Sequence, residues 1–209
     1  LFTLRLQYYA NLPKSLREIL KKDQDAVLQR RLLAKLPAVY PIDILLHEFL
    51  STFDMELEWD GDKLAVSHGD EISSSRVTAL IRSCQMITDY FNMVLGKLLL
   101  YQPERDQYQS ELLRLRLTNL NGDEDNTHKK PYLGSSSLPD DTVPVRLTSV
   151  YGLPHLLRLF DCFADKFEKL QSDSANILAL KIMTSDFITF IDENREKYFS
   201  LRRDYEAQE

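Results

Sequence analysis

Apolar side chains recur every three or four residues through most of this chain, a spacing that predicts helices with one buried face. The longest such segment is 73–100, and its last part, 91–100, is apolar on nearly all sides. A helix that is apolar all round belongs in the interior, so we expect this one at the centre of the domain. The same spacing predicts further helices at 41–53, 103–117, 153–170 and 173–196.

The N-terminal part of the chain predicts two shorter helices. The first begins near Pro13, which suits a first helical turn, and its apolar positions are Leu16, Ile19 and Leu20. Asp23 or Asp25 is a candidate cap for a second helix, which we expect to end before Pro37. The apolar positions of this second helix are Val27, Leu28, Leu32 and Leu36.

Two segments alternate apolar and polar residues with the period of a strand. One is the opening LFTLRLQYY, and the other is MELEWDGDKLAVSH at 55–68, where the pattern reverses around Asp60-Gly61 and predicts a β-hairpin. Residues 118–148 lose all periodicity and are rich in Asn, Asp, Ser, Gly and Pro, which predicts a flexible internal loop. The fold class is therefore all-α: one domain over residues 1–209, a bundle of about six to eight helices with a minor β-strand or hairpin element.

Composition narrows the class of protein. The 209 residues are 44% hydrophobic and 28% charged, as in a globular protein with a real core. The net charge of -6 argues against a protein that coats nucleic acid. No apolar run is long enough to span a membrane. The chain begins at Leu1 without a methionine or signal-peptide pattern, so we expect it to be part of a longer protein.

The two cysteines, Cys84 and Cys162, form no CxxC motif, so neither a disulfide framework nor a metal site is predicted. We expect both to be buried thiols in a reducing compartment.

Motifs that carry chemistry are missing from the sequence. His47-Glu48 begins like the HExxH motif of zinc proteases, but Ser51 occupies the place of the second histidine. No glycine-rich phosphate cradle and no GxSxG nucleophile motif is present. Cys162 lies two helical turns from His155, roughly 10 Å along the axis, which is too far for a thiolate–imidazole pair. We therefore expect no enzyme, no catalytic residue, no metal site and no cofactor.

The segment REILKKDQDAVLQRR at 17–31 is rich in Lys and Arg and is a candidate for nucleic-acid contact. Glu18, Asp23 and Asp25 are interleaved with the cations, which favours a solvated helix face instead. Weak nucleic-acid contact remains the alternative function, as an accessory activity.

The helix predicted at 153–170 carries two faces. One is a core stripe of Leu153, Leu157, Phe160, Phe167 and other apolar residues. The second contains His155, Leu159 and Cys162 at spacings of four and three. Such a helix either lies between two layers or presents its second face to a partner. Periodicity alone favours the interior.

Three blocks of sequence resemble a known family. They are LPKSLREILKKDQDAVLQRRLLAKLPA (12–38), DYFNMVLGKLLLYQPERDQY (89–108) and VYGLPHLLRLF (150–160). Together they resemble the MRG (mortality-factor-related) domain of chromatin regulators, over about 12–53 and 77–196 in matching order. The hairpin at 55–68 and the polar insert before the third block resemble the male-specific lethal 3 branch of that family.

The resemblance implies a non-enzymatic adaptor in the nucleus, on chromosomes, within a histone acetyltransferase complex. In the male-specific lethal 3 branch, the domain docks onto the male-specific lethal 1 scaffold in an apolar groove. A MYST-type acetyltransferase is then an indirect partner, and the function implied is acetylation of histone H4 at lysine 16, transcription regulation and dosage compensation.

The resemblance also implies partner-binding residues in two parts. The first helix supplies Leu20, Lys21 and Gln24, and the later helix supplies His155, Leu156 and Leu159. Relatives carry an apolar residue and a tryptophan where this chain has Lys21 and Gln24, so we expect the partner to rely on the second part or to follow a different path. We expect His155 to face outward as a recognition residue. Arg158 and Arg105 match family positions too, and we expect structural roles for both, Arg158 in an ion pair on the helix face and Arg105 as a cap or loop tie.

Overall fold

The computed structural model describes residues 12–53, 56–60, 63–67, 74–121, 145–169 and 175–207. Its elements in chain order are α1 (Lys14–Gln24), the π-helical turn η1 (Asp25–Gln29), β1 (Leu32–Ala34), α2 (Ile42–Ser51), β2 (Glu56–Asp60), β3 (Lys63–Ser67), α3 (Ser74–Val94), the π-helical turn η2 (Leu95–Leu99), the 3-10 turn η3 (Gln102–Glu104), α4 (Arg105–Asn121), the 3-10 turn η4 (Leu147–Ser149), α5 (Leu153–Lys169), α6 (Ala175–Glu193), α7 (Arg195–Tyr198), α8 (Leu201–Asp204) and β4 (Tyr205–Ala207).

The predicted fold class is confirmed. The described residues form eight α-helical segments, of which α7 and α8 are single turns of four residues. The strands of the described residues form two antiparallel two-stranded sheets, β1 with β4 and β2 with β3.

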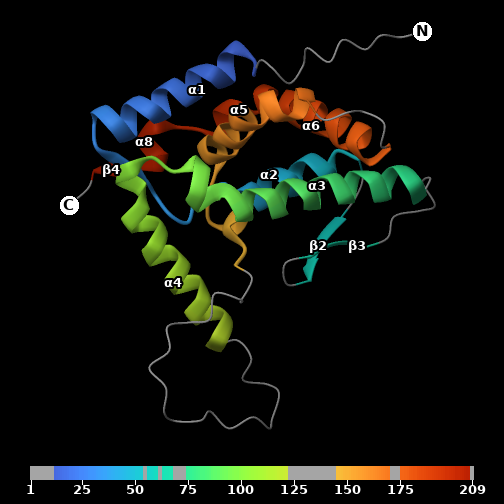
Figure 1. Ribbon diagram of the computed structural model, residues 1–209, viewed down its shortest axis with the longest axis horizontal. Helices are drawn as coiled ribbons and strands as arrows, with labels where there is room; N and C mark the ends of the chain where they lie inside the picture. Colours follow the sequence, from blue (N-terminus) through green and yellow to red (C-terminus); the bar gives the residue numbers. More distant parts are fainter. Residues whose placement is uncertain are drawn as a thin grey trace.

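The long central helix is also confirmed, as α3 continued by η2. Figure 1 shows α3 crossing the middle of the molecule, with α5 and α6 on one side and the β2–β3 hairpin on the other. Its side chains Cys84, Phe91 and Leu95 are fully buried and belong to the main hydrophobic core. Helix α3 packs against α6, and η2 packs against α5. The last turns are not interior on every side as expected, because Met93 and Leu98 are 57% and 54% exposed.

The hairpin predicted at 55–68 is the β2–β3 pair, in a register that runs from Glu56 opposite Ser67 to Asp60 opposite Lys63. Figure 1 also shows α4 projecting from the rest of the molecule. Because α4 extends to Asn121, residues 118–121 of the predicted loop are helical, and η4 begins before that loop was expected to end. Residues 122–144 of the loop, and the strand predicted at the start of the chain, lie outside the described residues.

The second N-terminal helix is a wrong prediction. The chain stays helical only to Gln29 and reverses at Arg31, whose φ of 54° is left-handed. It then forms β1, which pairs with β4 so that Leu32 lies opposite Ala207. The apolar spacing of residues 27–36 did not reveal this strand, because its partner lies at the other end of the sequence.

Cys84 is buried, as predicted, but Cys162 is exposed. Cys162 lies with Asp161 on the solvent side of α5, whereas the next residue, Phe163, still packs against the core. None of the helices in the described part of the chain combines the length and hydropathy needed to cross a bilayer.

Candidate functional site: a buried charge cluster beneath the outer face of α1

Helix α5 begins deep inside the molecule. Every residue from Leu153 to Phe160 is buried. The preceding Gly152 forms a β-bridge with Pro41, and a side chain at Gly152 would meet the Cβ of Ala38 at 3.0 Å and the carbonyl oxygen of Tyr40 at 3.1 Å. Glycine therefore allows the start of α5 to lie directly against the 38–41 segment.

The expected outward orientation of His155 is wrong. The exposed fraction is 2% for His155, 0% for Leu156 and 2% for Leu159. His155 packs edge-on against the Tyr151 ring, with 4.7 Å between the ring centroids. Its Nε2 atom lies 3.0 Å from Oε1 of Glu104, a buried carboxylate. This polar partner explains why the histidine is accommodated in the interior.

Arg158, one turn further along α5, is the centre of a buried charge cluster. Its Nε and Nη2 atoms donate to the two carboxylate oxygens of Asp23, each at 2.8 Å. Its Nη1 and Nη2 atoms donate to the two oxygens of Glu104, at 2.6 and 3.0 Å. Nη1 also donates to the carbonyl of Leu99 at 2.9 Å. We call Asp23, Glu104, His155 and Arg158 the buried charge cluster.

Two tyrosines complete the surroundings of the cluster. The hydroxyl of Tyr205 donates to Oδ1 of Asp23 at 2.6 Å. The guanidinium carbon of Arg158 lies 3.9 Å from the centre of the Tyr101 ring, and the Tyr101 backbone N–H donates to Glu104 at 2.7 Å. The cluster thus joins α1, the adjacent turns η2 and η3, α5 and β4, which come from four separate parts of the sequence.

The neighbours of Glu104 and Arg158 shift the pKa of each group in the direction that favours its charged form. Burial alone would raise the pKa of Glu104, but His155 and Arg158 outweigh it and lower that pKa to about 2. Burial would lower the pKa of Arg158, and Asp23 and Glu104 reverse this and raise it. Burial and the neighbouring Asp23 raise the pKa of the Tyr205 phenol. Since Asp23, Glu104 and Arg158 bind one another in the interior, the arrangement suits a structural tie between helices rather than reaction with a substrate.

The cluster also shows which residues the sequence reasoning missed. Asp23 was one of two candidate helix caps, the other being Asp25, yet it is fully buried and bonded to Arg158, 135 positions away. Glu104 received no role from the sequence. One signal was available: Asp23 continues the buried row of Leu16 and Ile19 at helical spacing, and a carboxylate in such a row needs a buried partner.

The outer face of α1 lies on the other side of the same helix. Lys21 and Gln24 are exposed, while Leu20 is partly buried and packs against the core. Helix α1 contacts α5, so the two predicted parts of the binding site are neighbours, but only the α1 part reaches the surface. Partner binding by these six residues stays a prediction, and for those on α5 it would require the interior to open.

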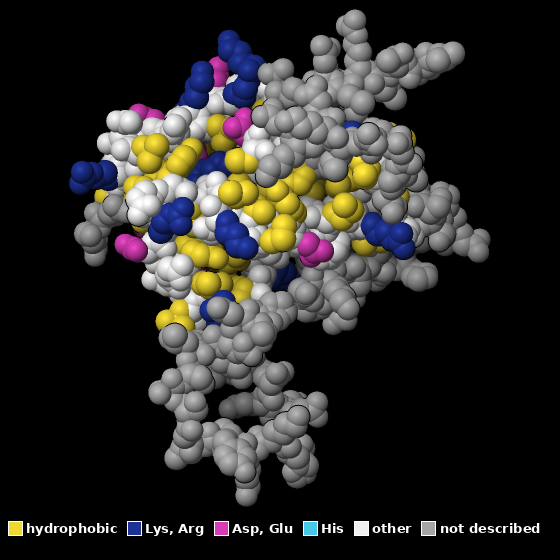
Figure 2. Space-filling model, viewed as in Figure 1, with side chains coloured by type: hydrophobic (Ala, Val, Ile, Leu, Met, Phe, Trp, Pro, Cys, Tyr) yellow, Lys and Arg dark blue, Asp and Glu magenta, His cyan; other side chains and the backbone are white. Residues whose placement is uncertain are grey.

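Hydrophobic side chains gather in a band across the face of the molecule seen in Figure 2, between α5 and α3. The exposed large apolar residues of the described chain include Leu28 in η1 and Leu98 in η2, which are 40% and 54% exposed. The described residues contain no group of three His, Cys, Asp or Glu side chains that could hold a metal ion.

Comparison of the sequence with known proteins identifies the family of the chain. The family model described as MRG matches residues 3–207. Mortality factor related protein 1 of Caenorhabditis elegans is 29% identical over 200 residues, which are 94% of this chain and 56% of that protein. Mortality factor 4-like protein 2 of Homo sapiens is 27% identical over 199 residues, or 95% of this chain and 55% of that protein. Protein MRG1 of Arabidopsis thaliana is 26% identical over 187 residues, or 90% of this chain and 44% of that protein. The chain therefore spans about half the length of these relatives.

Proposed function

The chain belongs to the MRG family, and on that premise we propose that it is a non-enzymatic interaction domain which docks a short segment of a scaffold subunit. The observation that carries the proposal is the contrast between the two sides of α1. Its inner side is tied to α5 by the buried charge cluster, and its outer side presents Leu20, Lys21 and Gln24. A rigid helix with a partly apolar outer face suits recognition of a peptide.

The proposal extends to the assembly. The resemblance to the male-specific lethal 3 branch supports a place in the nucleus, on chromosomes, in a complex with the male-specific lethal 1 scaffold and a MYST-type acetyltransferase. The function would then be to support acetylation of histone H4 at lysine 16 and transcription regulation, with dosage compensation as the process served.

Calorimetric titration of the domain with the male-specific lethal 1 segment tests this proposal. A truncated apolar anchor at an interface costs roughly 2 kcal/mol or more, so Leu20→Ala should weaken binding about thirtyfold. Leu178→Ala on α6, where the side chain is 45% exposed, is the control and should bind like the parent. An equal loss in both variants, or no binding by the parent, would contradict the proposal. Leu159 is unsuitable for this test, because its side chain is buried and its replacement would unsettle the core.

Nucleic-acid contact through residues 17–31 remains a second candidate, and one observation favours it. Asp23 points inward, so it does not offset the exposed cations of this segment. Two exposed carboxylates, Glu18 and Asp25, stand against five exposed cations, Arg17, Lys21, Lys22, Arg30 and Arg31. Gel-shift titration at several salt concentrations tests it, since about one log–log unit of salt dependence is expected per phosphate neutralised.

A further inference from the structure

The outer face of α1 and η1 carries a row of exposed side chains that runs from two cations through an amide to a leucine. Arg17, Lys21, Gln24 and Leu28 follow one another at spacings of three or four, which places them along one line of the helix. We call these four residues the outer row. Leu20 lies beside it, partly buried against the core.

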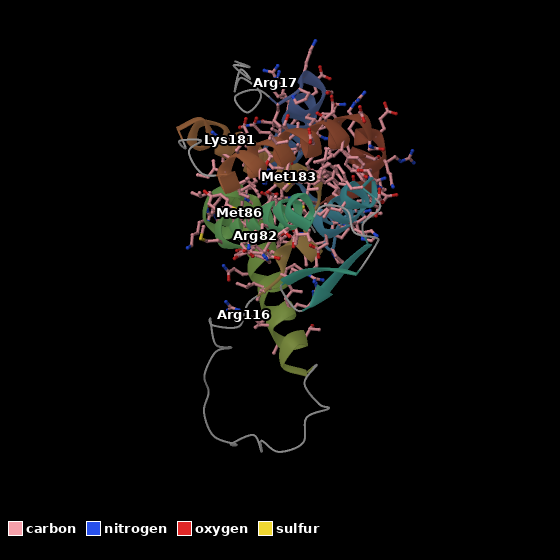
Figure 3. The ribbon with its side chains drawn as sticks, turned by 90° about the vertical axis from the view of Figure 1, so that its right-hand side faces the viewer. Arg17, Arg82, Met86, Arg116, Lys181 and Met183 are labelled. Atoms are coloured by element: carbon pink, nitrogen blue, oxygen red, sulfur yellow. The ribbon has the colours of Figure 1, made fainter. Side chains whose placement is uncertain are left out.

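The cations of the outer row are available for a partner. No ion pair or side-chain hydrogen bond joins Arg17 or Lys21 to another described residue, in contrast to Arg158, Arg203 and Lys197, which all bind carboxylates. The inward direction of Asp23 removes the acid nearest to Lys21 and Lys22 in the sequence from this face. Figure 3 shows Arg17 at the outer edge of the molecule, on α1.

We infer that the partner segment which docks on the outer row is acidic, with carboxylates on either side of an apolar residue. This inference rests on the proposed function and specifies the partner's chemistry. The carboxylates would meet Arg17 and Lys21, the apolar side chain would lie on Leu20 beside them, and the Gln24 amide would bind the partner's backbone. Opposite charges across an interface raise the association rate and fix the register of the bound segment.

The described surface favours a peptide over nucleic acid as the occupant. The large hydrophobic side chains whose exposure the structure describes as high are Leu, Ile, Val and Met, and none of these is an aromatic platform on which unpaired bases stack. Leu20 and Leu28 interrupt the cations with apolar surface that a phosphate backbone does not use.

Fluorescence anisotropy with labelled probes tests the inference. The first probe is a fifteen-residue peptide with a Phe and a Leu between glutamates, and the second is the same peptide with glutamine in place of every glutamate. The third is a single-stranded DNA of fifteen nucleotides, and the fourth is the male-specific lethal 1 segment. The test variant combines Arg17→Glu with Lys21→Glu.

The charge-matched control combines Arg82→Glu with Arg105→Glu, two exposed cations on α3 and α4. Figure 3 shows Arg82 well apart from Arg17. Circular dichroism of both variants confirms that they are folded before binding is measured.

We expect the acidic peptide to bind the parent at least tenfold more tightly than the glutamine peptide at low salt. The test variant should lose this preference and the control should keep it. The preference should also shrink as salt rises, because exposed charges are screened. Equal binding of both peptides, or equal loss in both variants, would overturn the inference.

The DNA and the scaffold segment distinguish a failure of this inference from a failure of the proposed function. Tighter binding of DNA than of the acidic peptide, lost in the test variant, would overturn the inference in favour of nucleic acid. If the scaffold segment binds, depends on Leu20 and is indifferent to both salt and charge reversal, the proposed function stands and the acidic partner is refuted. If the scaffold segment fails to bind at all, the proposed function itself falls.

Discussion

Helix α1 carries charged residues on two opposite sides, and the two sides differ in what the charges can do. Asp23 is fully buried and bonded to Arg158 and Tyr205, whereas the adjacent Lys22 is exposed. The buried charge cluster offers nothing to a partner because its members bind one another. The outer row offers its cations because nothing described binds them. Residue type alone therefore does not identify a binding residue. Whether a charged side chain is available to a partner protein depends on whether it already pairs with another group of the fold.

The buried charge cluster and the exposed charges should differ most in how much stability is lost when one charged side chain is replaced. Arg158→Met removes the cation between two buried carboxylates, which should lower the free energy of unfolding by about 3–5 kcal/mol. Arg114→Met on α4 is the control, since Arg114 pairs with Glu111 on an exposed helix face and should contribute less than about 1 kcal/mol. Urea unfolding followed by circular dichroism measures both. A loss below about 1 kcal/mol for Arg158→Met would mean that the cluster is not a structural tie.

The pH dependence of stability tests the same cluster through Glu104. The folded-state pKa of Glu104 is about 2 and lies below the ordinary value of 4.5, so the carboxylate stabilises the fold fully above about pH 4.5. That contribution is lost as the pH falls from 4.5 towards 2. The shift corresponds to about 3 kcal/mol, given 1.36 kcal/mol per pKa unit.

The Glu104→Gln variant supplies the comparison, because it cannot titrate at this position. Between pH 5 and pH 2 the parent should lose about 3 kcal/mol more than the variant does, measured by urea unfolding at each pH. Parallel curves for the two proteins would show that Glu104 is not held as a carboxylate by His155 and Arg158.

A smaller effect is expected from the hydroxyl that links the C-terminal strand to the cluster. Tyr205→Phe keeps the ring and removes the hydrogen bond to Asp23, which should cost about 2 kcal/mol because the acceptor is charged. Amide hydrogen exchange should quicken in β1 and β4, which pair there, before it quickens in α3. Uniform acceleration across the molecule would instead indicate that Tyr205 acts on global stability alone.

Some elements of the fold and of the candidate site could be predicted from the sequence, and others could not. Helices such as α3 and α6 were predictable because each buries a face with the helical period, and that period is local information. The β1–β4 pair was not predictable, since a three-residue strand has too few positions for a pattern and its partner is distant. Periodicity alone favoured the interior for His155, and the resemblance to the family moved the prediction to the surface. The polar partner that accommodates His155 in the interior is Glu104, 51 positions away, which no local pattern reveals. Of the predicted binding residues, those on α1 reach the surface because one local face of that helix is polar.

The smallest expected effect belongs to the outer row. Replacing Arg17 and Lys21 together by glutamine should change the free energy of unfolding by less than about 0.5 kcal/mol, because exposed cations without partners contribute little to stability. Glutamine keeps the helix propensity and an unbranched polar side chain, although a shorter one, so the main change is the loss of charge. Urea unfolding at low and at high salt provides the measurement. A loss above about 1 kcal/mol would place these cations in a stabilising network of their own, and the distinction between the two sides of α1 would then fail. A neutral outcome leaves the charges of the outer row without a role in folding, which is the condition that a surface retained for binding has to meet.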